Sequence, residues 1–149
     1  IFLEWAKNNP NKPTDVEKMF KIKIGDVPFI GFIDRVEISP EGEYEVVDFK
    51  TGYNYENKKS IREDYQMNIY ALGVEKVYGK LPKKASLFYI KKEKFVSYEI
   101  DAEQVELVRN IIEGKVQSIL AEEFEPTPGF STCKWCDYTP ICDAKEIEE

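Results

Sequence analysis

Residues 31–52, GFIDRVEISPEGEYEVVDFKTG, contain two runs of alternating apolar and polar residues on either side of a turn. The turn is residues 39–43, in which Gly42 can adopt the left-handed conformation that closes a three-residue loop. If the first and last residues of this turn, Ser39 and Glu43, face each other, the numbers of any two facing residues in the hairpin add up to 82. Asp34 then lies opposite Asp48, on the same side of a β-hairpin.

The alternation of side chains places Asp34 and Asp48 among apolar neighbours, including Ile30, Phe32 and Val36. Two facing carboxylates on such a face repel each other and are poorly solvated, unless a cation compensates their charge. Hard oxygen ligands of this kind suit Mg²⁺ or Mn²⁺. From spacing alone, ordinary surface ion pairs remain an equal alternative to a metal site.

Two further residues extend this candidate site. Lys50 follows Asp48 by two positions, so it shares its face and could hold a water or stabilise charge on a phosphate. Residues 16–24 alternate as a strand that a glycine turn connects to the hairpin, and this pairing sets Glu17 opposite Asp34. Glu17 is therefore a third acidic candidate, although a solvated glutamate would give the same pattern.

The segment after the hairpin predicts a helix that starts at a capping box, residues 60–63, with Ser60 as N-cap, and that ends near Tyr78. Gln66 and Tyr70 are four residues apart on one stripe of this helix. They face either a scissile phosphate or the solvent edge of the core.

The remaining pattern predicts a terminal helix, a second pair of strands and a long helix, in the order 1–7, 85–90, 95–100 and 101–122. The long helix carries an apolar stripe that should face the core, made of Val105, Val108, Ile111, Ile112, Val116, Ile119 and Leu120. The order of elements predicts an α/β fold with a mixed central β-sheet flanked by helices, followed by a C-terminal cysteine-bearing tail.

Composition predicts one globular domain, residues 1–149, with a core at about 14–122 and a tail at about 126–143. Apolar residues make up 42% and charged residues 33% of the chain, and no secretory signal or membrane span is visible. We therefore expect a cytoplasmic protein. Because the chain opens on Ile1 rather than on a methionine, we expect it to be a fragment of a longer protein.

The net charge of -7 argues against binding of nucleic acid by bulk electrostatic attraction. Lysine clusters at 58–59, 83–84 and 91–94 could contact phosphates locally, but scattered solvated lysines are the more common explanation. The chain contains no histidine, which excludes a histidine-metal nuclease or a cysteine-histidine nucleophile within these 149 residues.

Three cysteines, Cys133, Cys136 and Cys142, lie within ten residues, and no other cysteine is present. This spacing is typical of metal ligation, yet a zinc site or an iron-sulfur cluster usually requires four ligands. The fourth ligand would then lie upstream of Ile1, come from another chain, or not exist. A disulfide is less consistent with an intracellular protein.

Four elements in order resemble the RecB-type branch of the PD-(D/E)xK nuclease superfamily, in particular its iron-sulfur exonucleases and the C-terminal nuclease domain of UvrD/Rep-type DNA helicases. These elements are residues 31–35, residues 46–52, the Gln66-x3-Tyr70 pair and the Cys133-x2-Cys136-x5-Cys142 spacing. The resemblance covers roughly residues 17–142. It implies a restriction-endonuclease-like core.

The resemblance also implies roles for individual residues. Asp34 and Asp48 would be metal ligands, with the backbone carbonyl of Phe49 as a further ligand and Glu17 as an additional acidic group. Lys50 would orient the attacking water, while Gln66 and Tyr70 would help to position DNA and this lysine. Cys133, Cys136 and Cys142 would hold a [4Fe-4S] cluster in the full-length protein, because the fourth cysteine of the family is absent from this chain.

The function implied is Mg²⁺- or Mn²⁺-dependent hydrolysis of DNA, as an exonuclease of repair or recombination attached to helicase domains. The alternative is a catalytically weak or silent nuclease-fold module that binds DNA within a helicase or repair complex. The intact acid pair and Lys50 favour the enzyme, whereas the acidic composition and the missing cysteine favour the module.

Overall fold

The computed structural model describes residue 4, residues 7–52 and residues 58–145, and for Lys58 and Ile61 only the backbone is described. The predicted helix at residues 1–7 lies largely outside this part of the chain. Two compact units are present, residues 1–114 and residues 115–149. Within the described ranges, no helix is both long and apolar enough to cross a membrane.

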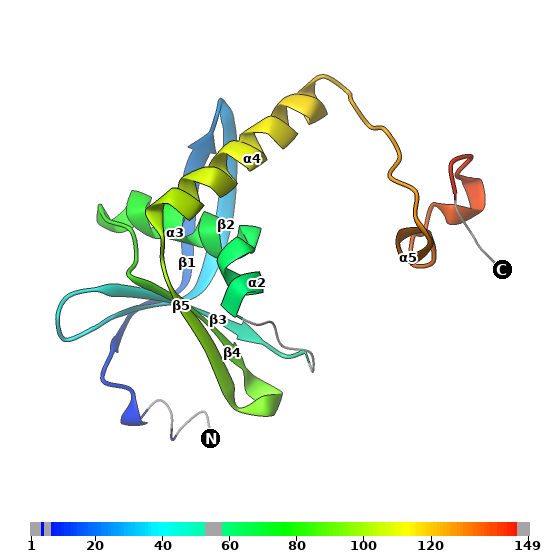
Figure 1. Cartoon of the computed structure of the whole chain (residues 1–149). Coiled ribbons are helices and arrows are strands. Elements are labelled where there is room, and N and C mark those ends of the chain that lie inside the picture. The colour runs from blue at the N-terminus through cyan, green and yellow to red at the C-terminus, as the bar shows by residue number, and fades with distance from the viewer. Residues whose placement is uncertain (1–3, 5–6, 53–57, 146–149) are drawn as a thin grey trace. The chain divides into compact units, whose positions relative to one another are not determined.

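The first unit is built on a five-stranded sheet in which the strands follow one another in the order of the sequence (Figure 1). The pairing of the third and fourth strands is parallel, and the other three pairings are antiparallel. The predicted mixed sheet is therefore confirmed. Its strands are β1 (Lys12–Ile24), β2 (Val27–Ile38), β3 (Tyr44–Lys50), β4 (Lys84–Tyr89) and β5 (Lys94–Glu99).

Both predicted registers are confirmed. Ile24 pairs with Val27 across the β1–β2 turn, and Arg35 pairs with Val47 between β2 and β3, so that facing positions sum to 82. Gly42 has a φ of 81°, the left-handed conformation that the loop requires.

The helix after the hairpin differs from the prediction, because it is divided into α2 (Lys58–Glu63) and α3 (Tyr65–Tyr78). The predicted N-cap at Ser60 is wrong, since this residue lies inside α2. Asp64 caps α3 instead: its backbone is extended and its side chain accepts a hydrogen bond from the Met67 N–H at 2.9 Å.

The long helix α4 (Ala102–Leu120) begins as predicted after Asp101, whose carboxylate accepts a hydrogen bond from the Glu103 N–H. Four residues of its apolar stripe are buried, namely Val105, Val108, Ile112 and Val116. The prediction of a core position is wrong for Ile111, Ile119 and Leu120, which are exposed. Ile111 lies at the flank of the stripe, and the other two lie in the last turn, beyond residue 114 where the first unit ends.

The helix α3 approaches the sheet closely around Phe20, whose ring contacts Tyr70 edge-on at 6.0 Å between centroids. A Cβ atom at Gly31 would lie 2.6 Å from this ring, and one at Gly73 would lie 2.7 Å from it. Two glycines therefore enclose the ring, one from the sheet and one from the helix. This close packing fixes the position of α3 over the strands that carry Asp34 and Asp48.

Candidate active site

The two aspartates lie where β2 and β3 separate, one position beyond the last ladder pair, Arg35 and Val47. Asp34 accepts a hydrogen bond from the Phe49 N–H at 2.9 Å, so its carboxylate ties the two strands together at this point. Asp48 is only 3% exposed, whereas Asp34 is half-buried.

The surroundings of Asp34 and Asp48 are less apolar than predicted. Val36 is buried, but Ile30 and Phe32 are 63% and 53% exposed. Ile33 and Val36 are both fully buried although they are three residues apart, so strict alternation is interrupted around Asp34. The prediction that Ile30 and Phe32 help to bury the carboxylates is therefore wrong.

Lys50 connects the acidic pair to α3. Its ammonium lies 2.8 Å from Asp48 Oδ2 and donates a hydrogen bond to Gln66 Oε1 at 2.7 Å. The Gln66 amide in turn donates to the Tyr70 hydroxyl at 2.9 Å. The structure thus brings Asp48, Lys50, Gln66 and Tyr70 into one continuous chain of contacts, from strand β3 across to helix α3.

The electrostatic environment of these contacting side chains favours a charged Lys50 and a neutral Tyr70. Burial raises the pKa of Asp48, against the lowering effect of Lys50. Burial opposes the charge of Lys50, but Asp48 outweighs it, so that the pKa of the ammonium is raised. Burial also raises the pKa of the Tyr70 hydroxyl, and the charges of Asp48 and Asp34 add to this effect. Lys50 is therefore a cation and Tyr70 a neutral hydroxyl at neutral pH.

Asp64 is a residue of this region that the sequence analysis did not single out. It caps α3 two residues before Gln66, and its charge raises the pKa of both Asp48 and Lys50. Asn68, itself buried, donates from its amide to the backbone carbonyls of Arg62 and Asp64. An aspartate directly before a helical run is a common N-cap signal, which the apparent capping box at residues 60–63 obscured.

Comparison with known families agrees with this geometry, because the model of the PD-(D/E)XK nuclease superfamily matches residues 1–143. The chain belongs to the PD-(D/E)XK nuclease superfamily.

Two curated relatives of this superfamily member are proteins of mycobacterial phages. The Gene 69 protein of Mycobacterium phage D29 is 30% identical over 139 residues, which is 89% of this chain and 49% of the relative. The Gene 69 protein of Mycobacterium phage L5 is 30% identical over 133 residues, which is 85% of this chain and 43% of the relative. The chain thus spans about half the length of the curated relatives that it matches.

A similar solved structure is that of SSO0001, with a TM-score of 0.52 and 21% sequence identity. The match covers 98% of this chain and 66% of SSO0001. At this level of identity the similarity concerns the fold alone.

The donor set at the end of the hairpin fits the divalent metal that PD-(D/E)XK nucleases generally use. Asp34 and Asp48 supply hard carboxylate oxygens, and Phe49, whose backbone carbonyl is the further candidate ligand, directly follows Asp48 in the sequence. Asp48 is buried beside a second carboxylate, and its raised pKa indicates that Lys50 alone does not compensate the charge. A bound divalent cation would complete this compensation.

Glu17 lies opposite Asp34 by register, between the ladder pairs Val16–Arg35 and Lys18–Ile33. It is exposed and has a φ of 48°, so the strand is irregular at this position. Over the described ranges, no three Cys, Asp or Glu side chains lie close enough together to hold a metal ion. Glu17 therefore does not complete a three-carboxylate cluster with Asp34 and Asp48.

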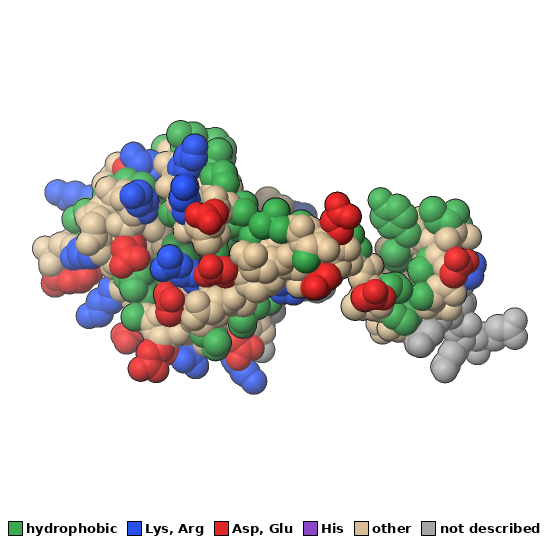
Figure 2. Space-filling model, turned by 90° about the horizontal axis from the view of Figure 1, so that it is seen from above, with side chains coloured by type: hydrophobic (Ala, Val, Ile, Leu, Met, Phe, Trp, Pro, Cys, Tyr) green, Lys and Arg blue, Asp and Glu red, His purple; other side chains and the backbone are tan. Residues whose placement is uncertain are grey.

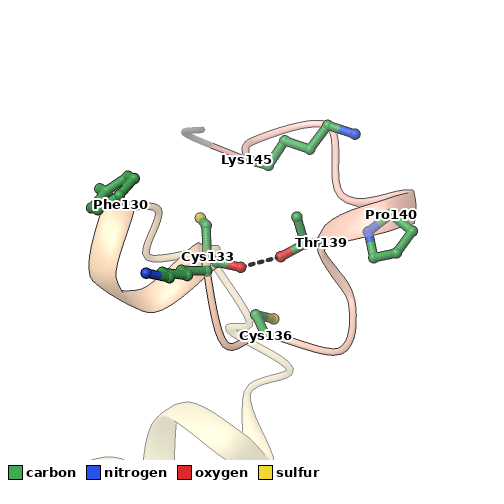
Figure 3. A pocket seen from close by; sticks show the side chains of 7 residues that line it. Phe130, Cys133, Cys136, Thr139, Pro140 and Lys145 are labelled. Atoms are coloured by element: carbon green, nitrogen blue, oxygen red, sulfur yellow. Dashed lines mark hydrogen bonds between the residues drawn. The ribbon is translucent and has the colours of Figure 1, made fainter. Parts of the chain in front are cut away.

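The cysteines of the tail lie in the second unit, on α5 (Phe130–Cys133), in the turn after it, and after a short 3₁₀ helix, η2 (Thr139–Ile141). Cys133 and Cys136 line a cavity of about 560 Å³ together with Phe130, Thr139 and Lys145, and Figure 3 shows these side chains. Cys133 is buried and Cys136 is exposed.

Among the described residues, no three potential metal ligands lie close enough together to hold an ion, and this includes the three cysteines. Cys133, Cys136 and Cys142 share a short segment, but in this structure they are not gathered around one point.

Proposed function

We propose that this chain is a Mg²⁺- or Mn²⁺-dependent deoxyribonuclease that hydrolyses phosphodiester bonds. The observation that carries the proposal is the contact chain from Asp48 through Lys50 and Gln66 to Tyr70, next to Asp34. A lysine held between a buried carboxylate and an amide has a fixed direction, which a charge-stabilising group requires.

Each side chain of this network has a role that follows from its contacts. Asp34 and Asp48 bind the divalent metal, which supplies Lewis-acid activation of the phosphate and of a bound water. Lys50 stays protonated, because its pKa is raised, and it stabilises negative charge on the phosphate and orients the water.

The orientation of the Gln66 amide follows from its two neighbours. Its oxygen accepts from Lys50 and its nitrogen donates to Tyr70. The Tyr70 hydroxyl, which accepts that hydrogen bond, can direct its own hydrogen toward a phosphate oxygen. Gln66 and Tyr70 therefore position Lys50 and the DNA, and neither needs to change its protonation state.

The resemblance of the motifs supports a finer assignment. We place the chain in the RecB-type branch, as a cytoplasmic exonuclease of DNA repair or recombination that acts together with helicase domains. We also take residues 1–149 as a single nuclease domain of a longer protein, since the family match spans 1–143 and the phage relatives are about twice as long. Co-purification of a helicase activity with the parent protein would test the helicase association.

A [4Fe-4S] cluster in the full-length protein belongs to the same finer proposal, with Cys133, Cys136 and Cys142 as three of its ligands. Its support is the spacing of the cysteines in the sequence. Iron and sulfide analysis of the parent protein tests it. A colourless, iron-free protein after anaerobic purification would refute the cluster and leave the proposed nuclease activity untouched.

The decisive experiment compares wild-type protein with Lys50→Ala on end-labelled single-stranded and duplex DNA in Mn²⁺. We expect cleavage to fall by about 10²–10³-fold, the usual effect of removing one group that stabilises developing charge. Lys12→Ala, at an exposed position on β1, is the matched control and should cleave like wild type. Equal cleavage by Lys50→Ala and wild type would indicate a contaminating nuclease and refute the assignment.

The second candidate function is a catalytically silent nuclease-fold module of a DNA-binding complex, because the net charge of -7 gives the isolated chain little bulk attraction for a DNA substrate and so favours limited activity in isolation. Metal titration separates the two candidates. A ligand that binds only the folded state raises the unfolding temperature. No rise with Mg²⁺ or Mn²⁺, together with no cleavage, would favour the module.

A further inference from the structure

A second surface of the first unit carries a concentration of positive charge that the candidate active site does not use. This basic groove has a volume of about 630 Å³ and lies between β1, α3 and α4. Its lining includes Lys21 and Lys23 from the strand, Leu72, Glu75 and Lys76 from the helix α3, and Arg109 from α4.

Several cations outside the groove are paired with carboxylates, whereas those of the groove are not closely paired. Lys18, Lys50, Lys80, Lys84, Arg35 and Arg62 each lie within 3.2 Å of a carboxylate oxygen. In contrast, Lys21, Lys23 and Lys76 have no ion-pair partner among the described residues, and Arg109 has only a looser contact of 3.6 Å with Glu106. Figure 2 shows basic side chains interspersed with acidic ones over the visible face of the sheet-bearing unit.

Uncompensated cations around a groove favour an anionic ligand. The lining combines four cations with the single carboxylate of Glu75, so its net charge is positive although that of the whole chain is -7. Lys21 and Lys23 are two residues apart on an edge strand, which spaces them by about 7 Å along its direction. Such a row of separate charges matches a ligand with repeated phosphates better than one with a single anionic group.

The groove lies on another side of α3 from the candidate active site. Gln66 and Tyr70 are four residues apart and share one stripe of this helix, whereas Leu72 and Lys76 form a second stripe. At 100° per residue, Leu72 is rotated by about 200° from Tyr70. A strand bound in the groove is therefore not the segment that lies at Lys50.

We propose that the basic groove binds the phosphate backbone of a nucleic-acid strand that flanks the cleaved segment. The proposal rests on the proposed nuclease function for the identity of its ligand. Lys21, Lys23 and Lys76 make the phosphate contacts, and Leu72 gives the groove an apolar floor. This surface explains how a strongly acidic domain holds DNA: the attraction is local and comes from lysines that carboxylates do not neutralise.

The test is the salt dependence of DNA binding by the 149-residue protein, measured by fluorescence anisotropy in EDTA so that no cleavage occurs. The probes are labelled dT30 and a 30-base-pair duplex. The groove variant is Lys21→Gln/Lys23→Gln/Lys76→Gln. The matched control is Lys7→Gln/Lys12→Gln/Lys115→Gln, which removes the same total charge from exposed positions outside the groove.

We expect the groove variant to bind at least about tenfold more weakly than the control at 50 mM salt. The slope of log K against log salt should also become shallower by about 2–3, because each lost phosphate contact contributes about 0.7–0.9. An all-arginine variant, Lys21→Arg/Lys23→Arg/Lys76→Arg, retains the charge and should keep the wild-type slope. Matching unfolding temperatures of the three variants would show that folding is not the cause.

Equal weakening in the groove and control variants would overturn the proposal, as would a wild-type protein that binds neither probe. Preferential binding of polyglutamate by the groove, with DNA binding unchanged in the groove variant, would also overturn it and indicate an acidic protein partner. The proposed nuclease function is judged separately, by the loss of cleavage in Lys50→Ala.

Discussion

The hairpin of β2 and β3, which carries the candidate active site, and the cysteine tail differ in how their polar side chains are held. In the hairpin, Asp34 is bonded to the backbone of a residue 15 positions away, and Lys50 is bonded to Gln66, 16 positions away. In the tail, the Thr139 hydroxyl bonds to the Cys133 carbonyl only six positions away. Long-range bonds fix side chains from different elements relative to each other, whereas local turns fix only the backbone of a short segment.

This difference explains why the polar side chains of the hairpin contact one another and those of α3, whereas the three cysteines are not gathered around one point. The hairpin residues meet because strand pairing and the packing of α3 both determine their positions. The tail instead leaves large apolar side chains exposed, including Trp135 at 82%. A cluster of cysteines in such a segment depends on a ligand or on further contacts to bring them together.

The largest expected difference between the two regions concerns the rate of DNA cleavage. Gln66→Leu removes the amide that orients Lys50 and should lower the cleavage rate by about 10–10²-fold, because the lysine loses its fixed direction. Steady-state cleavage in Mn²⁺ measures it. The corresponding change in the tail, Thr139→Val, removes a bond of that segment and should leave the rate unchanged; an equal loss would mean that the tail is part of the active centre.

The next effect is on stability. Gly73→Ala should lower the free energy of unfolding by about 1–3 kcal/mol, because the new methyl group would overlap the Phe20 ring, which Gly31 confines on its other side. This cost exceeds the gain of about 1 kcal/mol from replacing a helical glycine by alanine. Urea unfolding measures the difference.

The tail supplies the control for this substitution. Gly129 has an extended backbone with a φ of 166°, and a Cβ atom there would meet only Thr132 Oγ1, at 3.9 Å. Gly129→Ala should therefore leave the unfolding free energy within about 0.5 kcal/mol of wild type. Comparable losses in both glycine variants would contradict the packing argument for α3.

The smallest expected effect concerns Trp135. Because its side chain is 82% exposed, Trp135→Ala should change the free energy of unfolding by no more than about 0.5 kcal/mol. A loss of several kcal/mol in a thermal or urea titration would show that this side chain is buried in solution, and that the tail is more tightly held than its local bonds indicate.

Strand pairing was the most predictable part of the molecule. The period of two and the chemistry of the turn at residues 39–43 determine which positions face each other, so the opposition of Asp34 and Asp48 follows from the sequence. The helix boundaries were less predictable: Ser60 and Asp64 both satisfy N-cap preferences, and only the packing of α3 selects the second. The exposure of Ile30 and Phe32 was missed, because the break in alternation around Asp34 leaves no signature in the sequence.

The mixed order of elements and the hairpin register were predictable from the sequence, since turn chemistry and residue spacing act over short distances. The sequence also predicted Asp34, Asp48, Lys50, Gln66 and Tyr70 as candidate site residues. Other features depend on the tertiary structure. It set the contact of Lys50 with both Asp48 and Gln66, the cap at Asp64, and the basic groove in which Lys21, Lys23 and Lys76 meet Arg109. These features join segments that are far apart in the chain, and their positions follow from the packing of helices on the sheet.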